Sequence, residues 1–160
     1  MNKLSSADRA HILQLLCEGM SISAIERTTG SSKHTISQLM NDAGQALGAL
    51  QDGLFRNLQT KRVQVDEIWS FTYAKQKDVA TAKRQDLAYG DTWTWTAIDA
   101  DSKLVMSWLV GGRDSSYAMG LMDDLAKRLA NRVQLTSDGH RAYLEAVEGA
   151  FGADVDYPCW

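Results

Sequence analysis

Two aspartates lie in surroundings that favour metal-dependent chemistry. Asp66 is flanked by the apolar residues Val65, Ile68 and Trp69, where a carboxylate needs a compensating cation. Asp138 lies two residues after the short predicted strand 133–136. Carboxylates are the hard ligands that Mg²⁺ prefers, and two such ions about 3.5–4 Å apart can activate an oxygen nucleophile and neutralise charge on a phosphodiester. We interpret Asp66 as a candidate bridging ligand and Asp138 as an outer ligand.

The same residues also have structural interpretations. Asp66 could be a charge at a strand edge, and Asp138 with Gly139 could form an ordinary turn. Glu67 should point to the opposite face of its strand from Asp66, which indicates a structural or solvent-facing side chain. His140 could position a phosphate, transfer a proton or form a hydrogen bond within a loop. The residues alone leave these alternatives open.

A second group of polar residues opens a predicted helix near the N-terminus. Residues 4–40 show three short helical patterns, and Gly19 and Gly30 end the first two. This spacing is typical of a helix-turn-helix, whose recognition helix presents its first residues to the DNA major groove. We predict base or phosphate contacts from Lys33, His34 and Gln38, and backbone anchors at Ser31, Ser32 and Thr35. The alternative is a three-helix oligomerisation module with a polar surface.

The charge is distributed unevenly along the chain. The whole sequence of 160 residues has a net charge of −3. Residues 1–62 carry seven Lys or Arg against five Asp or Glu, whereas residues 63–160 carry ten against fifteen. A mildly basic head before an acidic body is compatible with a DNA-binding module joined to a carboxylate-based site, but both imbalances are small.

The hydrophobic pattern predicts how the body is organised. We expect a helix-turn-helix region at 1–45, a helical linker at 46–61 and an α/β domain at 62–160. Within that domain the predicted order is β-β-β-α-β-α-β, with strands near 62–71, 91–99, 104–110, 133–136 and 154–157 and helices near 117–130 and 143–151. A right-handed crossover would place the fourth strand beside the first and bring Asp66 and Asp138 onto adjacent strands. Ribonuclease-H-like nucleases and transferases have this arrangement.

Aromatic residues recur in the predicted strands. Trp93 and Trp95 alternate and therefore share one sheet face. We expect both to pack in the core rather than stack on bases, and we assign the same role to Trp69, Tyr73 and Trp108.

Four longer stretches carry a family resemblance. They are VDEIWSFTYAK, GDTWTWTAIDADSKLV, SWLVGGRD and VQLTSDGHRAYLEAV. Together they resemble the insertion-element transposases of the IS-one family over nearly the whole chain. The resemblance implies a helix-turn-helix joined to a ribonuclease-H-like domain with an Asp-Asp-Glu triad, in which Asp66 and Asp138 match the first two acids. It also implies Mg²⁺ or Mn²⁺ as cofactor, and double-stranded DNA as partner: the element's terminal inverted repeats and the target, bound by a homo-oligomer.

The chain departs from that family in two respects. The family's zinc-binding cysteines ahead of the helix-turn-helix have no counterpart here. The third acid of the family lies on a helix beyond the fifth strand, which this sequence does not reach, and Glu145 and Glu148 lie on the preceding helix. We therefore expect a truncated ribonuclease-H-like domain that folds incompletely and does not catalyse transposition by itself. Two alternatives stay open: a non-catalytic DNA-binding repressor of transposition and a ribonuclease-H-like nuclease unrelated to it.

The composition favours a reducing cytoplasm, and the resemblance implies a bacterial protein at the nucleoid. No apolar run reaches the roughly 18–20 residues of a membrane-spanning helix, and we see no basic-then-apolar leader. Cys17 and Cys159 are too few for a disulfide framework and lack zinc-ligand spacing.

Overall fold

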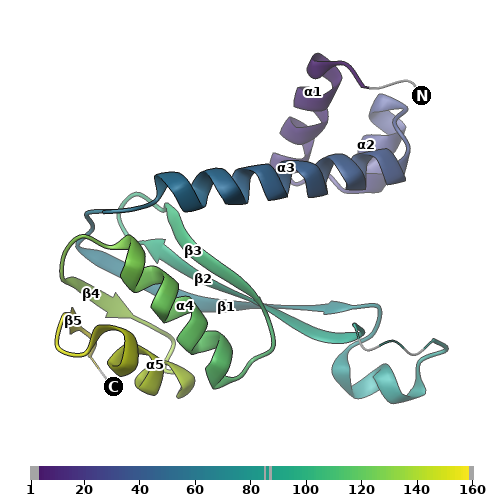
Figure 1. Cartoon of the computed structure of the whole chain (residues 1–160). Coiled ribbons are helices and arrows are strands. Elements are labelled where there is room, and N and C mark those ends of the chain that lie inside the picture. The colour runs from purple at the N-terminus through teal and green to yellow at the C-terminus, as the bar shows by residue number, and fades with distance from the viewer. Residues whose placement is uncertain (1–3, 85, 87, 159–160) are drawn as a thin grey trace. The chain divides into compact units, whose positions relative to one another are not determined.

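The computed structural model describes residues 4–84, 86 and 88–158, and Cys159 lies outside them. The chain forms two compact units, Met1–Leu54 and Phe55–Trp160. Figure 1 labels their helices and strands. The division follows Leu54, within the segment 46–61 that the sequence indicates as a linker.

The first unit consists of three helices around a small core. They are α1 (Ser6–Cys17), α2 (Ile22–Thr29) and α3 (Lys33–Leu54). Ser5 and Ser21 cap the first two helices through their side chains, which satisfies amides that have no partner inside the helix. The buried residues that hold the helices together are Ile12, Ile25, Ile36 and Leu39.

Helix α3 is longer than the pattern of glycines indicates. It runs unbroken through Gly44, Gly48 and Gly53 to Leu54. Each glycine disfavours a helix by about 1 kcal/mol relative to alanine, but strong helix formers such as Ala46 and Ala49 lie between them. The predicted helical linker at 46–61 is therefore, over its first half, the continuation of α3.

The second unit is built on a five-stranded mixed sheet in the order β3-β2-β1-β4-β5. Its strands are β1 (Arg62–Thr72), β2 (Gly90–Asp99), β3 (Val105–Gly111), β4 (Val133–Thr136) and β5 (Val155–Asp156). The first three strands pair antiparallel, and β1 with β4 and β4 with β5 pair parallel. The predicted mixed α/β class and the element order are confirmed, with one short additional 3₁₀ helix, η1 (Gln76–Thr81), between β1 and β2.

Two helices, α4 (Ser115–Arg128) and α5 (Ala142–Phe151), pack on the sheet (Figure 1). Their apolar residues form one core with inward residues of the strands, including Val63, Val65, Trp95 and Leu135. Alternation along β1 explains which residues enter this core, because Val63 and Val65 face the helices while Gln64 and Asp66 are exposed.

The predicted packing of the aromatic residues is right for two positions and wrong for three. Trp95 is fully buried and Trp93 packs against the core. Trp69, Tyr73 and Trp108 are 41%, 51% and 50% exposed. The β1–β2 hairpin extends beyond α4 and α5 (Figure 1). Trp69 lies in the second half of β1, and Tyr73 follows the end of that strand. Trp108 is next to inward-facing Leu109 and therefore points to the opposite face.

No helix among the described residues is long and apolar enough to cross a membrane.

Candidate functional site

The Asp66 carboxylate lies on the exposed face of the central strand β1. Its backbone pairs in register with Thr96 of β2, whose hydroxyl donates to the Asp66 carbonyl at 3.3 Å. One Asp66 carboxylate oxygen accepts the Glu67 amide at 2.8 Å. Its other carboxylate oxygen forms no hydrogen bond among the described residues, so the Asp66 carboxylate can bind a further ligand.

Asp138 lies in the turn that follows β4. Its Oδ1 accepts the His140 amide at 3.0 Å, and Ser137 Oγ accepts the Gly139 amide at 3.3 Å. Gly139 has a φ of 86°, a left-handed conformation that side chains disfavour. Asp138 thus does form a turn, as its structural interpretation says, and the turn also fixes the direction of its carboxylate.

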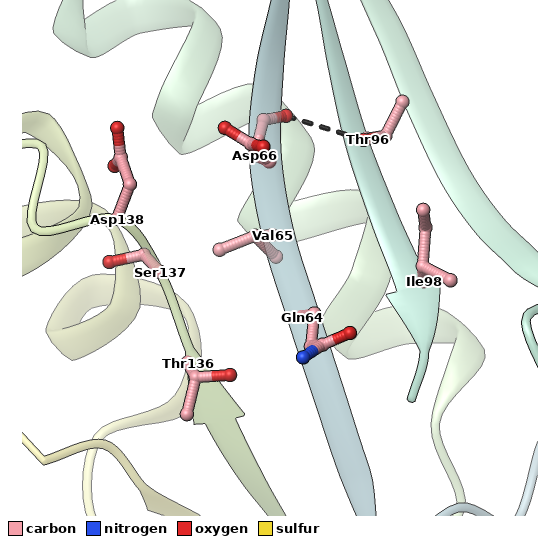
Figure 2. A pocket seen from close by; sticks show the side chains of 8 residues that line it. All are labelled: Gln64, Val65, Asp66, Thr96, Ile98, Thr136, Ser137 and Asp138. Atoms are coloured by element: carbon pink, nitrogen blue, oxygen red, sulfur yellow. Dashed lines mark hydrogen bonds between the residues drawn. The ribbon is translucent and has the colours of Figure 1, made fainter. Parts of the chain in front are cut away.

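Strand register brings the two aspartates together. Gln64 and Thr136 are the last paired residues of parallel strands β1 and β4, and Asp66 and Asp138 each follow them by two positions. Figure 2 shows both side chains lining one pocket, Asp66 from β1 and Asp138 from the turn beyond β4. Carboxylate oxygens of the pair lie within 4.8 Å of one another.

Glu67 belongs to the same cluster, which the sequence reasoning missed. One of its carboxylate oxygens lies within 4.8 Å of those of Asp66 and Asp138. Its side chain is only 1% exposed, so the solvent-facing interpretation is wrong. The signal was present in the sequence, because Glu67 continues the inward alternation of Val63 and Val65.

Arg113 compensates part of the charge of Glu67. Its guanidinium donates to Glu67 Oε2 at 3.3 Å and lies over the Trp93 ring, 4.5 Å from the centroid. The other carboxylate oxygen, Oε1, is buried and has no hydrogen-bond partner among the described residues. A buried charged acceptor in that state is unfavourable unless a donor or cation completes it.

Tyr143 of α5 reaches the cluster from within the core. Its ring is fully buried and packs edge-on against Trp95, with centroids 5.6 Å apart. Burial raises the pKa of Tyr143, and the nearby charges of Glu67, Asp138 and Asp66 raise it further. Hydrogen bonding to the Glu67 carboxylate also raises the pKa of Tyr143, although the two groups do not meet the geometry of a regular hydrogen bond.

His140 has a structural position in the turn. Its Nδ1 accepts the Ala142 amide at 3.2 Å, and its ring packs edge-on against Trp95 with centroids 5.9 Å apart. This is the hydrogen-bonded loop histidine of the sequence interpretation. Only Nε2 is left to contact a ligand.

The predicted DNA contacts lie at the start of α3 in the first unit. Lys33, His34 and Gln38 are exposed, whereas Ser31 and Thr35 are half-buried. Ser32 Oγ caps the helix by accepting the Thr35 amide at 3.2 Å, and Ser31 donates its amide to Thr29. The ammonium of Lys33 is 3.8 Å from Glu26, an exposed pair of the kind worth at most about 1 kcal/mol, so it remains able to exchange this partner for a phosphate.

Comparison of the chain with protein-family models and with curated proteins finds no match.

Proposed function

We propose that the chain is a DNA transposase of an insertion element, with a helix-turn-helix head and a ribonuclease-H-like second unit. One observation carries this proposal: Asp66 and Asp138 approach within 4.8 Å from neighbouring parallel strands, although 71 residues separate them in the sequence. The strand order, with β1 in the centre and β4 beside it, supports the ribonuclease-H-like arrangement. The proposed location is the bacterial cytoplasm, at the nucleoid.

The residues of the cluster fit a divalent cation. All three side chains offer the oxygen ligands that Mg²⁺ and Mn²⁺ prefer, and the buried Glu67 Oε1 has no other partner among the described residues. Asp66 and Asp138 would hold the ion. When bound, the ion supplies charge neutralisation at the phosphoryl group and lowers the pKa of the attacking oxygen.

The protein's own groups have simpler tasks in this proposal. The turn at Asp138 and the amide of Glu67 orient the two aspartates before any ligand arrives. The pocket beside them is lined by polar groups of Gln64 and Thr136, and it is open to solvent on the exposed face of β1. A DNA strand can therefore approach the carboxylates directly.

The head supports recognition of double-stranded DNA. The exposed Lys33, His34 and Gln38 at the amino end of α3 are suited to a major groove and its phosphates. We propose the terminal inverted repeats of the element and the target DNA as partners, bound by a homo-oligomer.

The test is an end-cleavage assay with the full chain, Mg²⁺ or Mn²⁺, and duplexes that carry or lack the inverted repeat. Cleavage at the repeat that disappears in Asp66→Asn supports the transposase. Cleavage without preference for the repeat supports a general nuclease instead. Specific binding without any cleavage would agree with the expectation that this chain does not catalyse transposition by itself, and it favours the repressor over an active enzyme.

A further inference from the structure

We infer that Glu67 supplies a third carboxylate oxygen to the cation held by Asp66 and Asp138. The inference rests on the proposed cation site and goes beyond it, because the sequence pattern gives Glu67 only a structural or solvent-facing role. Three features of the structure carry it: the convergence of the carboxylates, the burial of Glu67, and two polar atoms beside it that lack partners.

The carboxylates of Asp66, Glu67 and Asp138 converge on one point. Consecutive residues of a strand point to opposite faces, so Asp66 and Glu67 would ordinarily be unable to share a ligand. The pairing of β1 with β4 ends at Gln64, however, and the chain leaves the sheet at Thr136. Beyond that point the edge of β1 is open toward Asp138, and oxygens of all three side chains come within 4.8 Å of one another.

Burial makes the position of Glu67 costly without a cation. Its side chain is 1% exposed. Among the described residues, Glu67 forms an ion pair with a single cation, Arg113. Arg113 contacts Oε2 and is itself 39% exposed. Two aspartates beside Glu67 add negative charge that a single guanidinium does not balance.

Unpartnered polar atoms point to a missing ligand. Glu67 Oε1 and the Tyr143 hydroxyl are both buried, and although their side chains interact, neither atom forms a regular hydrogen bond among the described residues. Buried polar groups are nearly always satisfied in native proteins. A cation bound by the three carboxylates would complete Glu67, and one of its water ligands would donate a hydrogen bond to the Tyr143 hydroxyl oxygen.

The experiment measures binding of Mn²⁺ alone to the full chain, by calorimetry or electron paramagnetic resonance, without DNA. Glu67→Gln keeps the shape of the side chain and removes its charge, and it should weaken Mn²⁺ binding at least tenfold. Glu145→Gln is the matched control, because Glu145 is an exposed carboxylate on α5. It should leave the dissociation constant unchanged.

The two proposals fail in different ways. If Asp66→Asn abolishes Mn²⁺ binding while folded Glu67→Gln binds like the parent, the cation site stands and the role of Glu67 is overturned. If Asp66→Asn binds Mn²⁺ like the parent, the proposed cation site itself is wrong.

A second measurement applies if Glu67→Gln does not fold. The carboxyl carbons of the five glutamates can be labelled with ¹³C in the unmodified chain. Saturation with Mg²⁺ should shift one glutamate resonance, and that resonance should not move in the Asp66→Asn variant. If Mg²⁺ changes the chemical shift of none of the five glutamate resonances, the inference is overturned.

Discussion

Asp66 and Asp138 each lie two residues beyond a directly paired position, since Gln64 of β1 is the partner of Thr136 in β4. A shift of one residue in this register would move one carboxylate along the strand direction by about 3.3 Å and turn a β1 side chain to the other face. The geometry of the proposed cation site therefore depends on the short parallel pairing of three residues in each strand.

Replacement of Arg113 should lower the stability of the protein, because it leaves the buried negative charge of Glu67 without a neighbouring cation. Arg113→Met keeps an aliphatic side chain over Trp93 but removes the ion pair with the buried Glu67 carboxylate. We expect a loss of about 2 kcal/mol in the free energy of unfolding, less than for a fully buried pair because Arg113 is 39% exposed. Urea denaturation without metal measures it, and Lys127→Met, at an exposed position on α4, is the control.

Metal should partly reverse that loss. Mn²⁺ is expected to raise the unfolding midpoint of Arg113→Met more than that of the parent, because the cation replaces a missing positive charge. An equal increase of the unfolding midpoint in both proteins would show that the bound cation does not interact with Glu67.

Asp124 should make stability depend on pH. It accepts hydrogen bonds from Arg128 and Ser107, and these outweigh its burial and hold the pKa of Asp124 below the ordinary value. The unfolded state therefore binds more protons near pH 4, so this contribution is present above the ordinary pKa and disappears as the pH falls. Urea denaturation of the parent at pH 7 and at pH 3.5 should show the decrease.

The Asp124→Asn variant separates this group from the other carboxylates. Its pH dependence should be weaker by about 1 kcal/mol, a value discounted for the 35% exposure of the carboxylate. Profiles of equal slope in the parent and the variant would show that Asp124 is not responsible.

Gly111 should not tolerate a side chain. A Cβ at this position would lie 1.8 Å from Cε1 of Tyr117, whose ring packs against the core. Gly111→Ala should therefore lower the free energy of unfolding by about 1–3 kcal/mol as the ring is displaced.

Gly149 provides the matched substitution. It lies within α5, and a Cβ there has no heavy atom within 4 Å, so Gly149→Ala should raise stability by about 0.5–1 kcal/mol. Thermal unfolding of the two variants side by side gives the comparison. Equal shifts in the same direction would contradict the close approach of Tyr117.

Lys33 should contribute to DNA binding through charge. Lys33→Ala is expected to weaken binding on all sequences and to lower the slope of log affinity against log salt by about one. Gln38→Ala should instead change the preference between sequences. Fluorescence anisotropy over a salt series measures both, with Arg9→Ala on α1 as a control. If the salt dependence of DNA binding has the same slope in Lys33→Ala as in the parent, Lys33 does not contact a phosphate.

The sequence predicts much of the fold because alternation and helical periodicity are local. It indicates the order of strands and helices in the second unit and the inward positions of Trp93 and Trp95. The exposure of Trp69 is not local, because it depends on how far α4 and α5 extend over the sheet, and the exposure of Trp108 depends on which face of the sheet these helices cover. Period-two alternation alone does not say which faces are covered.

The meeting of the two aspartates was predictable from the sequence, whereas for Glu67 alternation indicates only an inward side chain and not its approach to the aspartates. A crossover from β3 through α4 to β4 suffices to bring Asp66 and Asp138 onto neighbouring strands. The approach of Glu67 depends on where the pairing of β1 and β4 ends, which hydrophobicity does not encode. The contacts of Glu67 with Arg113 and Tyr143 follow from packing alone.

The most direct test of the central claim is a double-substitution cycle on Mn²⁺ affinity with Asp66→Asn, Asp138→Asn and the double variant. If both aspartates bind the same ion, each single substitution should remove tight binding, and the double variant should bind no more weakly than either one. Effects of the two substitutions that simply add, or Mn²⁺ binding that survives both, would contradict a cation held between Asp66 and Asp138.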